Sequence, residues 1–299
     1  MRRDPRPLAT ALLLALLAGC ASTAPLPPAT ATGDPDREML PDLVRKAEAA
    51  LTDGRHAEAG HHYKRIVAID PASIAARFGM AEIRLAAGDA SRAQELFEGL
   101  VDHPDYGPRA LQGRGLARLM LGQHRAAEDD LRKAVGRDPS LWRAWNGLAQ
   151  IQDGERAWTA SRGSYEKALT VVPDSPVVHN NLGFSFMMQG RIEEATRAFL
   201  TALRRQPDLK AAQANLRLAL AWEGRYVDAL AGVGMAQLPE VLNNLGYVAM
   251  VKGDLPVAEA YFTRAIEASP SYYRIAAENL IRLKAMRDAK TAHTAVWKE

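Results

Sequence analysis

Small, large and glycine positions recur from Leu40 onward with a period of 34 residues. Glycine occupies one position of the period at five of its six occurrences: Gly54, Gly88, Gly122, Gly190, Gly224. At the sixth occurrence the residue is Arg156. Five residues later there is always a small residue: Ala59, Ala93, Ala127, Ser161, Ala195, Ala229. Four residues further, in the first five cases, the residue is large: Tyr63, Phe97, Leu131, Tyr165, Phe199. A fixed period of this length indicates stacked structural repeats.

Each period predicts a helix, a glycine-containing turn and a second helix. The small residue lets the second helix approach the first closely, and the large residue four positions on fills the space between them. No stretch alternates as a strand would, so we expect an all-α fold. Seven units are expected, with these first residues: Leu40, Ile74, Pro108, Trp142, Pro176, Lys210, Pro239. Ser175 is expected to cap the fifth unit's first helix, with Pro176 in its first turn.

These residues resemble the pattern of tetratricopeptide repeats (TPR). The resemblance implies a right-handed superhelical solenoid of helix-turn-helix units, which we expect over residues 39–272. Residues 273–299 are expected to form a capping C-terminal helix and a tail. The helix, from Tyr273 to about Lys290, would cover the open apolar end of the array.

The sixth unit departs from the pattern. It has 29 residues instead of 34, with Gly232 and Gly234 where its second helix should finish. Arg217 also occupies a first-helix position at which the neighbouring units have Gly183 and Gly246. We therefore expect the regular stacking to be interrupted here, and we predict that this is the weakest stacking interface of the array.

The N-terminal segment predicts export. Three arginines within Met1–Pro7 precede an apolar run, Leu8–Leu17, that is too short to span a bilayer, so residues 1–19 are interpreted as a signal peptide. Leu17-Ala18-Gly19-Cys20 resembles the lipobox of bacterial lipoproteins. That resemblance implies cleavage before Cys20, acylation of its sulfur, including with palmitate, and attachment to the membrane. No aspartate follows Cys20, which in such lipoproteins implies the outer membrane, facing the periplasm.

Residues 20–38 are interpreted as the lipidated N-terminus and a linker rich in Pro, Thr and Ala. Removing the signal peptide removes three arginines and one aspartate, which lowers the formal net charge from +3 to +1. With no block of like charges, the chain lacks the footprint of a nucleic-acid binder.

Motifs for catalysis are absent. Gly113-Arg-Gly115 and Gly232-Val-Gly234 lack the third glycine of a dinucleotide-binding loop, and no GxSxG, HExxH or P-loop sequence occurs. The histidines at 56, 61 and 62 do not suggest a metal site, because adjacent helical residues point about 100° apart. The acid pair Asp129-Asp130 is interpreted as an exposed helix face. We expect no enzyme activity, cofactor, metal or small-molecule substrate.

The resemblance to TPR proteins implies that the first helices line a concave surface for protein partners. Asparagine, a poor helix former, recurs there beside aromatic and methionine side chains, which suggests a partner-binding groove. An amide both donates and accepts hydrogen bonds and could hold an extended peptide backbone, or it could tie neighbouring helices together. Both interpretations stay open for these asparagines. The candidate groove residues are Asn180, Asn181, Phe184, Met187, Asn215, Asn243, Asn244, Tyr247, Met250.

The combination of an acylated cysteine, a linker and a repeat array resembles outer-membrane assembly lipoproteins, in particular the Tad/Flp pilus assembly lipoproteins. The likeness lies between Pro176 and Gly253. It implies a non-catalytic scaffold that assists assembly of a pilus or its secretin, with protein partners from that secretion or assembly system. The alternative is a periplasmic adaptor lipoprotein that recruits peptidoglycan hydrolases or proteases.

Overall fold

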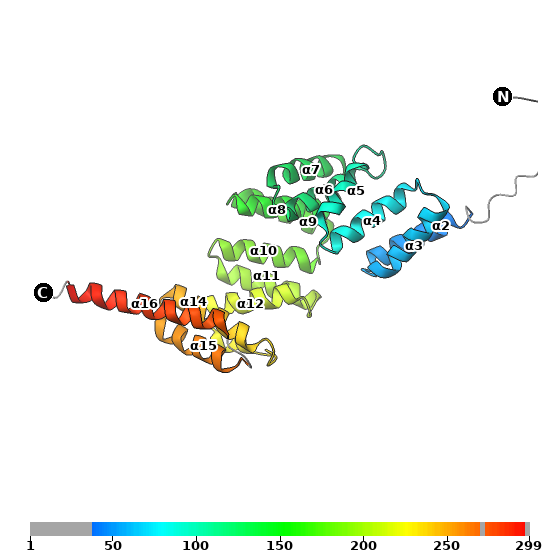
Figure 1. Cartoon of the computed structure of the whole chain (residues 1–299). Coiled ribbons are helices and arrows are strands. Elements are labelled where there is room, and N and C mark those ends of the chain that lie inside the picture. The colour runs from blue at the N-terminus through cyan, green and yellow to red at the C-terminus, as the bar shows by residue number, and fades with distance from the viewer. Residues whose placement is uncertain (1–37, 270–272, 297–299) are drawn as a thin grey trace, which may run out of the picture.

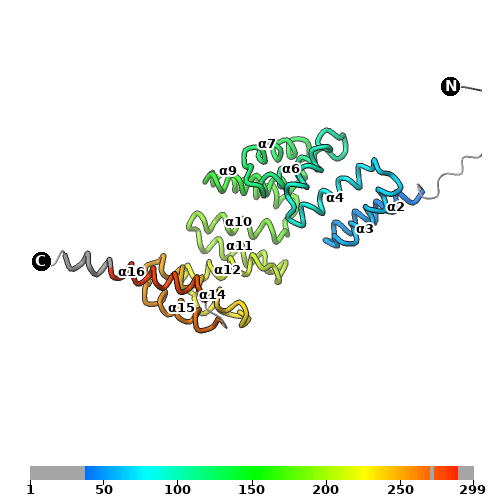
Figure 2. The backbone as a smooth tube through the Cα atoms, viewed as in Figure 1, coloured from blue at the N-terminus to red at the C-terminus, as the bar shows by residue number. Residues whose placement is uncertain are grey.

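The computed structural model describes residues 38–269 and 273–296, with side chains as far as residue 288. Fifteen helices and no strand occur in these residues. Antiparallel helix pairs follow one another along an elongated, curved path, with α2 and α3 at one end and α15 and α16 at the other (Figure 1). The trace in Figure 2 follows the same path. The predicted all-α repeat solenoid is confirmed.

Seven first helices begin within one residue of the predicted starts of the units, and we number the units accordingly. Their bounds are α2 (Leu40–Thr52), α4 (Ile74–Ala86), α6 (Gly107–Met120), α8 (Trp142–Gly154), α10 (Pro176–Met188), α12 (Lys210–Trp222) and α14 (Leu238–Lys252). Short polar side chains begin some of them. The Ser175 hydroxyl accepts a hydrogen bond from the backbone N–H of Val178, with Pro176 in the first turn, as predicted.

The second helices vary more in length. They are α3 (His56–Ile69), α5 (Ala90–Glu98), α7 (His124–Arg137), α9 (Trp158–Val171), α11 (Ile192–Arg205), α13 (Tyr226–Leu230) and α15 (Leu255–Glu267). Four have 14 residues, whereas α5 has nine and α13 only five. The two short helices therefore leave long connections to the next unit.

The glycines of the repeat occupy left-handed turns between the paired helices. Gly122, between α6 and α7, has φ of 73°, and the corresponding glycines have similar values. Arg156 holds the same turn between α8 and α9 with φ of 58°, and it is the one non-glycine residue with positive φ in the described part of the chain. Glycine adopts this conformation without the steric cost that a Cβ brings.

In each of the first five units, the core contains one large side chain of the repeat, packed among small residues. Tyr63, Phe97, Leu131, Tyr165 and Phe199 are each at most 1% exposed, and the small residues at the repeat position before them are fully buried. Leu131 shows the arrangement: a Cβ added to Gly115 of α6 would lie 2.8 Å from it, and one added to Gly147 of α8 would lie 2.9 Å from it. The large side chain thus lies between the first helix of its own unit and that of the next unit. We call it the keystone residue.

The last helix, α16 (Arg274–Val296), closes the C-terminal end. Its Ala276 and Leu283 are buried against α14 and α15, in clusters that include Leu242 and Phe262. The helix therefore caps the array as predicted, and it runs six residues beyond the predicted end at Lys290.

Candidate partner-binding surface

The asparagines predicted for the groove bond to one another across neighbouring first helices. Asn181 of α10 donates to the Asn146 side-chain oxygen of α8 at 3.0 Å, and Asn180 donates to Asn181 at 3.2 Å. Asn215 of α12 donates to Asn180 at 3.0 Å, which completes a chain of four amides over three helices. We call this chain the amide ladder.

A second, shorter set of amides lies at the C-terminal end. Asn279 of α16 donates to Asn243 of α14 at 3.0 Å, and Asn243 donates to Asn244 at 3.4 Å. Asn180 and Asn243 are only 8% and 6% exposed. These contacts favour the interpretation that the asparagines tie helices together, because amides bonded to one another satisfy groups that burial would otherwise leave unpaired. Asn181, Asn215 and Asn244 are half-buried and keep unused hydrogen-bonding capacity.

The apolar candidates divide into exposed and buried residues. Phe184 and Tyr247 are 44% and 47% exposed, as a partner-binding surface requires. Met187 is half-buried and packs against the core cluster around Phe199. Met250 is buried against Phe262, so its assignment to the groove is wrong. Its position in α14 faces α15 and α16, where the repeat core continues.

The prediction missed exposed apolar residues at the ends of first helices, two of which follow candidate methionines directly. Met188 and Val251 are 45% and 53% exposed, one residue after Met187 and Met250 respectively. Adjacent helical residues point about 100° apart, so only one of Met187 and Met188 can face the core. Because both are methionine, the sequence does not show which one it is.

Phe184 and Met188 line a cavity of about 310 Å³ together with Gln150 of α8. Gln150 also lines a cavity of about 580 Å³ against α4 and α6.

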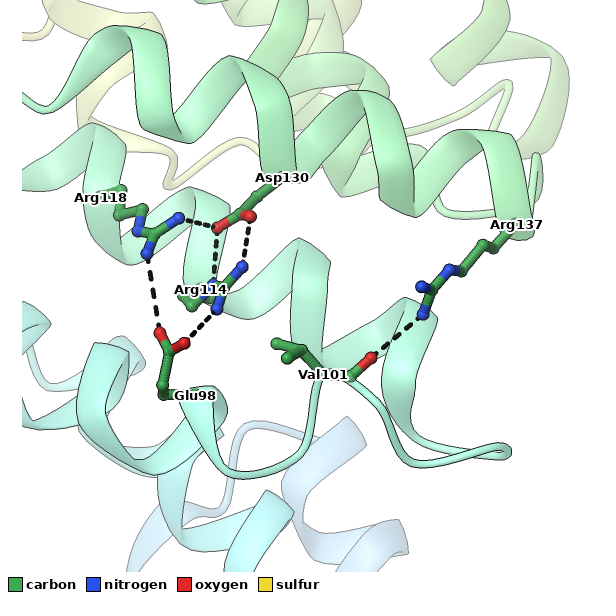
Figure 3. A network of polar contacts seen from close by, with 6 residues as sticks. All are labelled: Glu98, Val101, Arg114, Arg118, Asp130 and Arg137. Atoms are coloured by element: carbon green, nitrogen blue, oxygen red, sulfur yellow. Dashed lines mark hydrogen bonds and ion pairs between the residues drawn. The ribbon is translucent and has the colours of Figure 1, made fainter.

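An ionic cluster around the buried Asp130 joins the second and third units (Figure 3). Asp130 of α7 is 1% exposed, which corrects the prediction that this acid pair lies on an exposed face. Its carboxylate accepts hydrogen bonds from Arg114 Nε and Nη2 at 2.7 and 2.5 Å and from Arg118 Nη1 at 2.7 Å. Glu98 at the end of α5 pairs with both arginines.

The cluster is an ion-paired network that links α5, α6 and α7. The hydrogen bonds to Asp130 are the main cause that raises the pKa of Arg114. Two arginines against two acids leave no net charge, and the Asp130 carboxylate accepts three hydrogen bonds from them. The adjacency of Asp129 and Asp130 concealed the difference between them: Asp129 is exposed, whereas Asp130 faces α6.

Cys20 and the predicted signal peptide lie outside the described residues. Within residues 38–269 and 273–296, no helix combines the length and the apolar character needed to cross a bilayer. In the same part of the chain, no three histidine, cysteine or acidic side chains converge as metal ligands would.

Comparison with known families accounts for this architecture. Two tetratricopeptide-repeat profiles match the sequence, one over residues 50–112 and the other over residues 113–176, 181–234 and 236–273. The chain belongs to the tetratricopeptide-repeat family. TPR solenoids present extended binding surfaces to other proteins, so the chain is a protein–protein interaction scaffold.

Individual TPR relatives are distant. A TPR repeat-containing protein of Pseudomonas aeruginosa is 27% identical over 177 residues, which covers 58% of this chain and 30% of the relative. Superkiller complex protein 3 of Mus musculus is 27% identical over 158 residues, 52% of this chain and 9% of the relative. The chain thus spans less than a third of the length of these curated relatives.

Among solved structures, the human IFIT1 dimer with m7Gppp-AAAA superposes with a TM-score of 0.61 at 14% identity, covering 86% of this chain and 64% of that chain. At this identity the similarity concerns the TPR fold only.

Proposed function

We propose that this TPR protein is a lipid-anchored, non-catalytic scaffold at the outer membrane that faces the periplasm and assists assembly of a Tad/Flp-type pilus or its secretin. The carrying observation is the order of parts: the lipobox-like Leu17-Ala18-Gly19-Cys20, a Pro-rich segment, and then a repeat array. Acyl chains on Cys20 would hold the array at the membrane. The 17 residues between Cys20 and Glu38 could extend at most roughly 60 Å, which bounds the reach of the scaffold.

The anchor is tested by labelling cells with radioactive palmitate. Cys20→Ser should abolish incorporation and leave an uncleaved precursor, whereas Ser22→Ala should be labelled and processed like the wild type. Continued labelling of Cys20→Ser would exclude this anchor.

The assembly role is tested by deleting the gene in its native host. In the deletion strain, secretin multimers should be lost and monomers should accumulate, and a wild-type copy should restore the multimers. The protein captured from solubilised envelopes should carry pilus-assembly proteins. Normal multimers in the deletion strain, together with capture of peptidoglycan hydrolases or proteases, would replace this proposal with the adaptor function.

Exposed first-helix residues are the proposed contacts for the partner. Phe184→Ala should weaken binding of the captured partner roughly ten-fold, because an exposed aromatic ring at an interface contributes more than its truncated form. Leu200→Ala is the matched control, since Leu200 is similarly exposed but lies on second helix α11. Equal loss in both variants would contradict the assignment of the surface.

The amides are tested by changing Asn181, Asn215 and Asn244 together to alanine. A weaker complex at an unchanged melting temperature would support peptide binding. A lower melting temperature with unchanged affinity of the folded protein would support the helix-tying role that the amide ladder favours.

A further inference from the structure

The sixth unit lacks its keystone residue. The repeat position that holds Leu131 in the third unit and Phe199 in the fifth is Val233 here. Because α13 ends at Leu230, Val233 follows the helix and is only half-buried. Tyr226 and Leu230 of α13 pack against the α12 and α14 cluster, but no large side chain of this unit stands at the keystone position.

A cavity lies where the missing side chain would pack. In the third unit the keystone Leu131 lies between Gly115 and Gly147. The equivalent positions in the sixth and seventh units are Arg217 and Asn244, and both line a cavity of about 190 Å³ between α12 and α14. A cavity of roughly 150 Å³ in a protein core can bind benzene, so this one has room for an aromatic ring.

The lining combines an apolar wall with excess positive charge. Leu218, Val241 and Leu245 supply the wall. Lys210 and Arg217 are its cations and Glu240 its single acid, a net charge of +1. Neither cation has an ion-pair partner within 4.0 Å among the described residues, whereas Arg114 and Arg118 each form an ion pair with Asp130. An acidic group near the cavity would therefore gain attraction without displacing an existing ion pair.

We propose that this cavity is a docking site for an aromatic side chain of a protein partner, carried on a segment with acidic residues next to the ring. The ring takes the place that the keystone residue has in the other units, and the acids meet Lys210 and Arg217. The partner thus completes the sixth unit of the solenoid from outside. This inference rests on the proposed scaffold function, but it does not depend on the identity of the envelope system.

The test is a fluorescence-anisotropy titration of the full-length protein with a labelled peptide, Ser-Asp-Glu-Phe-Glu-Asp-Ser. Peptides with Phe→Ala, or with all four acids changed to Lys, should each bind about ten-fold or more weakly, since each loses one of the two attractions. Equal affinity of the Phe and Ala peptides would overturn the ring site. Equal affinity of the acidic and basic peptides would overturn its charge preference.

Variants of the protein locate the binding. Ala214 is exposed at the mouth of the cavity, so Ala214→Phe should obstruct the site without disturbing the core and should abolish measurable binding. Ala211→Phe is the matched control, because Ala211 is exposed on the same helix but does not line the cavity. Unchanged binding to Ala214→Phe would overturn the location, and circular dichroism would verify that both variants are folded.

The chain's own Met235, which is 76% exposed in the connection after α13, is the competing occupant. If the wild type binds no peptide and Met235→Ala does, the cavity is closed by its own loop and the proposed partner site is overturned. These outcomes are independent of the proposed pilus role, because the peptide titration involves no pilus protein. A failed capture of pilus proteins would leave the peptide result intact.

Discussion

Helices α5 and α13 are both shorter than the other second helices, yet only α5 keeps the keystone residue. Helix α5 retains its keystone residue, Phe97, which is fully buried in its last turn. Helix α13 ends three residues before the keystone position, and a cavity lies between the neighbouring first helices. The two short helices therefore differ in whether they reach the position from which the large side chain packs between the first helices.

The connections that follow the two short helices also differ. After α5, Leu100 is 1% exposed, and Arg137 of α7 donates to the Val101 carbonyl at 3.1 Å (Figure 3). Glu98 adds ion pairs to Arg114 and Arg118. After α13, Met235 is 76% exposed, and the connection supplies no keystone side chain. One connection is thus fixed to the core, whereas the other lies on the surface.

The largest effect on stability is expected from removing the Asp130 carboxylate from the ionic cluster beside the connection after α5. Asp130→Ala leaves Arg114 and Arg118 without their buried carboxylate and should lower the free energy of unfolding by about 3–5 kcal/mol. Urea denaturation measures this change. Asp129→Ala is the control, since Asp129 is exposed and its loss should change stability by less than about 0.5 kcal/mol. Similar losses in both variants would contradict the role of the cluster.

The contact between Phe97 and α6 can be tested by replacing Gly113, which lies against Phe97, and Gly163, which does not, with alanine. A Cβ at Gly113 would lie 2.3 Å from the Phe97 ring, so Gly113→Ala should cost about 1–3 kcal/mol through overpacking. Gly163, in the middle of α9, has no such neighbour within 4 Å, and Gly163→Ala should stabilise the protein by about 0.5–1 kcal/mol. Thermal unfolding of the two variants should shift in opposite directions, and a shift in the same direction would contradict the packing.

A smaller effect is expected at the turn between α8 and α9. Arg156→Gly should raise the free energy of unfolding by about 1 kcal/mol, because glycine accepts the left-handed conformation without a Cβ clash. The reverse change, Gly122→Arg at the equivalent turn, should lower it by a similar amount. Denaturant titration measures both free energies of unfolding. If Arg156→Gly left the free energy of unfolding unchanged while Gly122→Arg lowered it, this account would be contradicted.

Several features of the fold were predictable because they depend on residue spacing. The 34-residue period gave the start of each unit to within one residue, and the short sixth unit was visible as 29 residues. The short α5 was not visible, because its longer connection restores the period. The period also could not separate Asp130 from Asp129, since that distinction depends on a partner 16 residues away on another helix.

The candidate surface was predictable only in part, because some of its features depend on contacts between different helices. Repeat positions correctly indicated that Phe184 and Tyr247 are exposed. They could not show that Asn215 bonds to Asn180, because that contact depends on the relative rotation of α10 and α12. The cavity between α12 and α14 follows from where α13 ends, and helix ends are among the features least determined by sequence pattern.

Hydrogen exchange of the full-length protein, followed by mass spectrometry, tests most directly whether the sixth unit is the weakest interface. Local opening is easiest where coupling between neighbouring repeats is poorest. Backbone amides between about residues 210 and 238, including those of α12, should exchange faster than the amides of first helices α8 and α10. The amides of α6 should be at least as protected as those of α8 and α10. Equal protection of α12, α10 and α6 would contradict the account.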